Sequence, residues 1–128
     1  MRLKLKKPRI KHEHREQIAY VKWAQYARIG GFKLSPYLFA HPNGGSRHLF
    51  EAVNLKREGV KAGLPDLAIY VPRGKFHGLF LEMKRRDGGI VSKAQEEVIE
   101  SLRGVGYRVE VCHGWEHAKQ ITEEYFNE

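Results

Sequence analysis

Asp66, Glu82 and Lys84 are the residues of this sequence whose types and spacing could do chemistry together. Asp66 follows Pro65 at the start of one apolar run, and Glu82 lies in a second run with Lys84 two positions beyond it. Because side chains alternate between the two faces of a strand, Glu82 and Lys84 should share a face while Met83 points into the opposite layer. If the two runs pair in register as a hairpin, Asp66 faces both.

Two carboxylates packed this closely in a partly buried site repel each other, and one takes up a proton unless a cation compensates. Oxygen ligands suit Mg²⁺ or Mn²⁺, and Mg²⁺ often shares its coordination with a substrate phosphate. Such an ion lowers the pKa of a bound water and neutralises charge on phosphorus, as phosphodiester hydrolysis requires. Lys84 could accept a proton there or hold the attacking hydroxide by a hydrogen bond, and the sequence leaves both roles open.

The elements that position these residues follow from hydrophobic periodicity and from breaker residues. Glu13 to Ile29 reads as a helix ended by Gly30-Gly31, with Glu16, Tyr20, Trp23 and Ala27 on one face. Tyr37 to His41 reads as a strand that leads into the Pro42 to Gly45 turn, and a further helix is expected from Ser46 towards Gly59.

The second half of the sequence predicts a hairpin followed by a helix, a strand and a helix. The hairpin strands are Leu67–Val71 and Leu79–Lys84, joined by a connection rich in turn residues. Ser92 to Gln95 matches a capping box ahead of a helix whose apolar face includes Val98, Ile99, Leu102 and Val105. A strand over residues 107–112 and a helix from Trp115 to Phe126 end the chain. Tyr20, Trp23 and Trp115 are expected in the core rather than as base-stacking platforms.

Charge indicates a polyanionic partner. The net charge is +8 at pH 7, and residues 1–95 hold 20 Lys and Arg against 7 Asp and Glu, whereas residues 96–128 hold 3 against 8. Nucleic acid is the usual partner of such a polarised positive field, because neutralising phosphates releases counterions. A merely solubilising surface charge is the duller alternative.

Length and composition predict one domain over residues 13–128, preceded by a basic arm over residues 1–12. No apolar run approaches the ~20 residues of a membrane span, so we expect a soluble intracellular protein that does not enter a membrane. Cys112 is the only cysteine, which excludes an internal disulfide framework and a cysteine-based zinc cluster. His12, His14, His113 and His117 are read as surface or phosphate-contacting residues, since no third metal ligand is evident.

Four segments of the sequence resemble a phage-type VRR-NUC domain, a branch of the PD-(D/E)xK nuclease superfamily. They are Gly59 to Leu67 (GVKAGLPDL), Gly78 to Lys84 (GLFLEMK), Ser92 to Gln95, and Gly106 to Cys112 (GYRVEVC). The similarity extends from about Glu13 to Tyr125 and includes the Pro-Asn-Gly-Gly turn at residues 42–45.

The resemblance implies an α/β, restriction-endonuclease-like fold with a mixed central sheet of about four strands flanked by helices. It also implies metal-dependent cleavage of DNA, often branched or flapped. Some stand-alone viral members resemble Holliday junction resolvases and act as homodimers. We therefore expect a homodimer with a role in DNA repair or recombination. The expected location is the cytoplasm, or the cytoplasm of the host cell if the protein is viral.

Carried over by position, the resemblance assigns Asp66 and Glu82 to a Mg²⁺ or Mn²⁺ site completed by the backbone carbonyl of Met83. Lys84 would be catalytic, and Gln95 would be the polar residue of the following helix. The acid of the first helix maps best to Glu16, with Glu13 one turn away as the alternative.

Basic and polar residues outside this group are the expected DNA contacts, which hold the backbone without sequence selectivity. They are Lys4, Lys6, Lys7, Arg9, Lys11, Asn43, Lys61, Arg85 and Arg86. The alternatives are a non-catalytic nucleic-acid-binding module and a subunit of a DNA recombination or repair complex. Each site residue also has a duller explanation of its own: Asp66 could only cap a turn, Glu82 and Lys84 could form an exposed same-face ion pair, and Gln95 could only complete the capping box.

Overall fold

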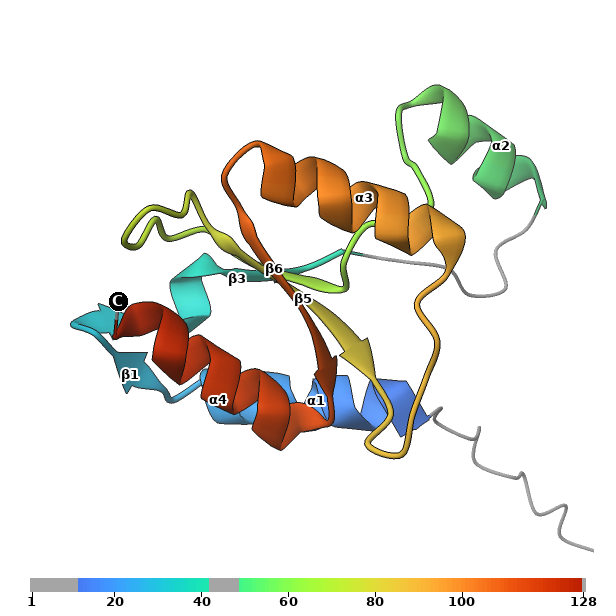
Figure 1. The fold of residues 1–128 in the computed structure, drawn as a ribbon. Coiled ribbons are helices and arrows are strands. Elements are labelled where there is room, and N and C mark those ends of the chain that lie inside the picture. Colours follow the sequence, from blue (N-terminus) through green and yellow to red (C-terminus); the bar gives the residue numbers. More distant parts are fainter. Residues whose placement is uncertain (1–11, 42–48, 128) are drawn as a thin grey trace, which may run out of the picture.

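The structure, a computed structural model, describes residues 12–41 and 49–127 (Figure 1). Helices are interspersed with strands along the chain, and the named strands are two to six residues long. The elements are α1 (His12–Ala24), β1 (Arg28–Ile29), β2 (Phe32–Lys33), the 3-10 helix η1 (Ser35–Tyr37), β3 (Leu38–Ala40), α2 (Leu49–Arg57), β4 (Leu67–Ile69), β5 (Leu79–Lys84), α3 (Lys93–Gly104), β6 (Arg108–His113) and α4 (Trp115–Phe126).

The main sheet has four strands in the order β3-β4-β5-β6. The pairs β3/β4 and β4/β5 are antiparallel, and β5/β6 is parallel because α3 carries the chain across before β6 begins. Leu67 pairs with Leu81 and Ile69 with Leu79, so the predicted hairpin is present and in register. The expected mixed four-stranded sheet flanked by helices is therefore confirmed.

One face of this sheet packs against α1 and α4, which lie side by side beneath the strands in Figure 1. Leu79, Leu81 and Met83 point into this layer and are at most 2% exposed. Tyr20 is fully buried in the same core, and its hydroxyl forms a 2.7 Å hydrogen bond with the hydroxyl of Thr122 on α4. Trp23 and Trp115 pack against the core as predicted.

The opposite face carries a smaller core under α3, above the strands in Figure 1. Ala68, Phe80 and Val109 come from three adjacent strands, and Ile99 of α3 covers them. The alternation of the strand puts Glu82 on this face together with Phe80, because the two are separated by one residue. The site side chains therefore lie on the α3 side of the sheet.

The first helix is shorter than the sequence predicts, because it ends at Ala24 rather than Ile29. Gly30 and Gly31 form the turn between β1 and β2, with Ile29 paired to Phe32 across it. Their φ angles are 57° and 84°, the left-handed region that a tight two-residue hairpin turn requires of both central residues. A glycine pair therefore made a strand reversal where we expected a helix stop.

The predicted capping box is present at the N-terminus of α3. The hydroxyl of Ser92 accepts the N–H of Gln95, and the Gln95 side chain accepts the N–H of Ser92. Ile99 is buried as expected, whereas Val105 lies just past the helix and is 64% exposed. The predicted cap at Ser46 and the turn at residues 42–45 lie outside the described residues. Within those residues, no helix has the length and apolar character needed to span a membrane.

Candidate active site

The loop before β4 places Asp66 beside the first turn of α3. Gly63 has a φ of 93°, and a Cβ there would lie 2.6 Å from the carbonyl oxygen of Ala94. Only glycine fits that approach, since neither the conformation nor the space admits a side chain. Pro65 is buried behind it. Tight packing of this loop against α3 therefore sets the position of Asp66, directly before β4 begins at Leu67.

His41 anchors the same loop from β3, a role that the sequence did not indicate. Its backbone N–H donates to the carbonyl of Asp66 at 2.8 Å, and its Nδ1 lies 2.7 Å from the carbonyl of Pro65. A carbonyl can only accept, so Nδ1 carries the proton in this contact. The signal was the position of His41 at the end of a predicted strand, which alone does not identify its partner.

Asp66 and Glu82 meet at the end of the β4/β5 hairpin, one step beyond the Leu67–Leu81 pair. The backbone N–H of Met83 donates to Oδ2 of Asp66 at 2.8 Å, which holds that carboxylate against β5. The N–H and C=O of one strand residue point to the same neighbour, so the Met83 carbonyl lies on the edge of β5 that faces Asp66.

Glu82 is a buried carboxyl group with one oxygen left unpaired. Its side chain is 3% exposed, and Oε1 accepts a hydrogen bond of 2.9 Å from the amide of Gln95. Oε2 is buried and has no hydrogen-bond partner. Burial and then the neighbouring Asp66 carboxylate raise the pKa of Glu82 to about 8, although Lys84 opposes them. In the absence of a metal ion, Glu82 therefore holds a proton at neutral pH, as expected for two crowded carboxylates.

Lys84 and Gln95 complete the group. The Nζ atom of Lys84 lies 3.7 Å from Oε1 of Glu82 and donates to Oε1 of Gln95 at 3.2 Å. The same Gln95 oxygen accepts the N–H of Ser92 at 2.9 Å. One amide therefore caps α3, orients Glu82 and holds the lysine, which is 8% exposed.

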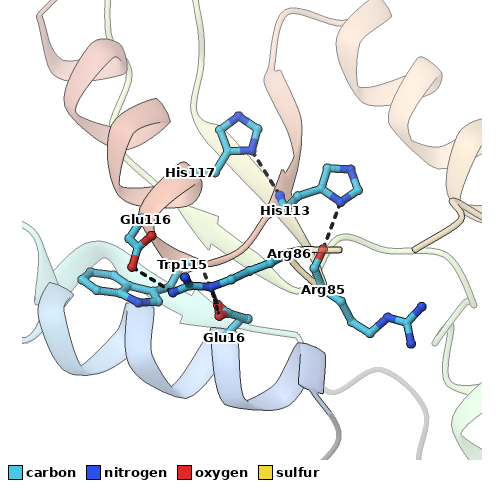
Figure 2. A network of polar contacts seen from close by, with 7 residues as sticks. All are labelled: Glu16, Arg85, Arg86, His113, Trp115, Glu116 and His117. Carbon is cyan, nitrogen blue, oxygen red and sulfur yellow. Dashed lines mark hydrogen bonds and ion pairs between the residues drawn. The ribbon is translucent and has the colours of Figure 1, made fainter. Parts of the chain in front are cut away.

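Glu16 does not join these residues. One of its oxygens pairs with Nε of Arg86 at 2.8 Å, and the other accepts the backbone N–H of Trp115 at 3.0 Å (Figure 2). In the described part of the chain no group of three or more Asp, Glu, His or Cys side chains could hold a metal ion. Arg86 and the start of α4 engage Glu16 in this structure, and the expectation that Glu16 adds a third carboxylate to the site stays a prediction. The side chain of Glu13 lies outside the described residues.

The expected DNA contacts are only partly placed. Arg86 is held by Glu16 and also by Glu116 at 2.8 Å (Figure 2), and these carboxylates raise the pKa of its guanidinium. Its charge is thus compensated within the protein. Arg85 is half-exposed with Asp87 at 3.6 Å, and Lys61 is exposed. The others, Lys4, Lys6, Lys7, Arg9, Lys11 and Asn43, lie outside the described residues.

His113 and His117 contact the backbone and each other in this neighbourhood (Figure 2). The N–H of His113 donates to Nδ1 of His117 at 3.1 Å, and Nδ1 of His113 lies 3.1 Å from the carbonyl of Arg85. Both rings therefore help to join β6, α4 and the turn after β5. No described acidic or cysteine side chain adds a third ligand to this pair.

The VRR-NUC domain family matches residues 9–116 of the chain. Among solved structures, a protein described as a VRR-NUC domain protein matches with a TM-score of 0.80 and 32% sequence identity, over 94% of this chain and 92% of the other. No curated protein matches the sequence.

Proposed function

The chain belongs to the VRR-NUC family of nuclease-type domains that act on DNA, and from this premise we propose that it is a Mg²⁺- or Mn²⁺-dependent endodeoxyribonuclease. The observation that carries the proposal is the convergence of Asp66, Glu82 and Lys84 at one end of the β4/β5 hairpin. The unpaired, buried Oε2 of Glu82 adds to it.

The donor set fits a divalent cation. Two carboxylates crowd together, one buried oxygen lacks a partner, and Glu82 carries a proton that a cation can replace. Asp66 and Glu82 would hold the ion together with the carbonyl of Met83, since hard cations take carboxylate and carbonyl oxygens. The chemistry supplied by such an ion is a more acidic bound water and charge neutralisation at the phosphate.

Other groups around the two carboxylates would contact the substrate or hold the metal ligands in position. Lys84 presents a cation beside the carboxylates, where its Nζ can donate a hydrogen bond to a water molecule or to a phosphate oxygen. Gln95 limits the movement of Lys84 and Glu82 through hydrogen bonds to both. The N–H of Met83 keeps Asp66 turned towards them.

A cleavage assay with matched variants tests the proposal. Wild-type protein should cut DNA with Mg²⁺ or Mn²⁺ and not with EDTA. Asp66→Asn and Lys84→Ala should each cut at least about 100-fold more slowly. Asp87→Asn, which changes a carboxylate that is 83% exposed, is the control and should cut like wild type.

Cleavage at the wild-type rate by both site variants would contradict the proposal. A gel shift without products in either metal would favour the non-catalytic binding module instead. Isothermal titration of Mg²⁺ into wild type and Asp66→Asn separates loss of the ion from loss of the reaction.

We extend the proposal to branched DNA and to a homodimer, on the strength of the resemblance noted from the sequence. Cutting a junction on two strands needs two active sites, which a two-fold symmetric dimer supplies. A panel of Holliday junction, flap and plain duplex, run beside a native mass measurement, tests both points. A protein that stays monomeric at working concentration would exclude paired cutting.

A further inference from the structure

Two exposed aromatic rings lie on the same sheet face as the candidate active site. Phe39 of β3 is 55% exposed, and Tyr70, directly after β4, is 52% exposed. Their ring centroids are 5.7 Å apart and the rings are tilted by 60°. Phe39 pairs with Ala68, and Ala68, Tyr70 and Asp66 share one face because they alternate along the chain. We call Phe39 and Tyr70 the aromatic step.

The Tyr70 ring of the aromatic step is fixed by contacts with Phe80 and His41. The Tyr70 ring packs edge-on against Phe80, with centroids 6.3 Å apart. The Tyr70 hydroxyl donates a hydrogen bond of 3.2 Å to Nε2 of His41, because Nδ1 of that ring already donates to the carbonyl of Pro65. His41 itself stacks on Phe80 at 6.0 Å. A ring fixed in this way loses little further freedom when it binds a ligand.

The aromatic step is continuous with the site. His41, two residues from Phe39, bonds the backbone of Asp66 and thus joins the step to the metal-binding carboxylate. At ~3.3 Å per strand residue, Tyr70 lies roughly 13 Å from Asp66 along the strand. The small core under α3 includes Phe80, whereas the two rings of the step remain open beyond it.

We propose that the aromatic step stacks on an unpaired base of the DNA strand that enters the site, so that the substrate class is DNA with single-stranded nucleotides beside the scissile phosphate. This rests on the proposed function only for the position of that phosphate. Bases inside a duplex already stack on one another, whereas an unpaired base offers its whole face to an aromatic ring. The chain as a whole carries a net charge of +8, which favours a polyanion as its partner, and the aromatic step shares its sheet face with the candidate active site, where such a strand would lie.

The test measures stacking without cleavage. In EDTA, a single-stranded oligonucleotide that contains 2-aminopurine is titrated with wild type and with the double variant Phe39→Leu/Tyr70→Leu. Leucine keeps the surface apolar and the fold intact but removes the flat faces, and thermal unfolding verifies the fold. Tyr26→Ala removes a tyrosine that is 85% exposed elsewhere and is the matched control.

We expect wild type and Tyr26→Ala to quench the 2-aminopurine fluorescence, and the double variant to lose the quenching. Its Kd for the single strand should rise at least about fivefold, while its Kd for a blunt duplex stays within about twofold. Quenching and affinity equal to those of Tyr26→Ala would overturn the proposal. If the double variant loses the quenching but the wild type cuts no DNA, the stacking site is supported and only the proposed function is refuted.

Discussion

Replacement of Glu82 by Gln should make the metal-free protein more stable at neutral pH. In the folded chain the pKa of Glu82 is raised to about 8 by burial and by Asp66, against an ordinary value of 4.5. Between these two values the unfolded chain loses this proton and the folded chain retains it. Because the folded state binds more protons there, its stability falls as pH rises through the window.

The magnitude follows from that difference. Each pH unit inside the window corresponds to about 1.4 kcal/mol, so from pH 4.5 to pH 7 the wild type loses about 3 kcal/mol that the neutral amide of Glu82→Gln does not lose. Urea unfolding in EDTA across pH 4.5–8 measures it. The two proteins should agree at the acid end and separate steadily above it.

The control is Glu123→Gln, which removes an exposed carboxyl on α4 and should follow the wild-type curve. Saturating Mg²⁺ should narrow the gap between wild type and Glu82→Gln at pH 7, because binding to the folded state alone adds to its stability. Curves for wild type and Glu82→Gln that stay parallel over the whole range would refute the account of a crowded, protonated carboxyl.

Three further outcomes are expected. Gln95→Ala should reduce the cleavage rate about 10- to 100-fold, because residues that support metal ligands in this way orient them. Ser92→Ala should lower the free energy of unfolding by about 1 kcal/mol and leave most of the cleavage rate. Measurements of the cleavage rate and of thermal unfolding distinguish the two effects. Gly63→Ala should lower Tm more than Gly59→Ala, because both have positive φ but only Gly63 meets a neighbouring carbonyl. Arg86→Gln should lower the free energy of unfolding only slightly in low salt, and 1 M salt should shrink the difference, because exposed ion pairs are screened by salt.

The sequence predicted the parts of the site that depend on local pattern. Strand alternation and turn residues located the hairpin that brings Asp66 to Glu82, and the Ser-x-x-Gln spacing located the cap that brings Gln95. Contacts between distant segments were not predictable in this way. Glu16 pairs with Arg86, which is 70 positions away in the sequence, and nothing in the helical face that carries Glu16 indicates that partner.

Breaker residues were the second source of error. Gly30-Gly31 is compatible with a helix stop and with a tight hairpin turn, and the choice depends on whether strands can pair across it. Here Ile29 and Phe32 pair and pack against the main core, so tertiary contacts decided the outcome. The exposure of Phe39 and Tyr70 could not be predicted from the sequence either, since it depends on how the strands and helices pack in the folded chain.

The position of Gln95 limits which substitutions the start of α3 tolerates. A capping box accepts Glu as readily as Gln at its third helical residue, so helix stability alone would leave the choice open. At this position a glutamate would bring a third anion towards Asp66 and Glu82 and could not donate to Glu82 Oε1. Gln95→Glu should therefore preserve the helix start while weakening the site, and a substitution that is neutral for an ordinary helix is excluded here by the carboxylate next to it.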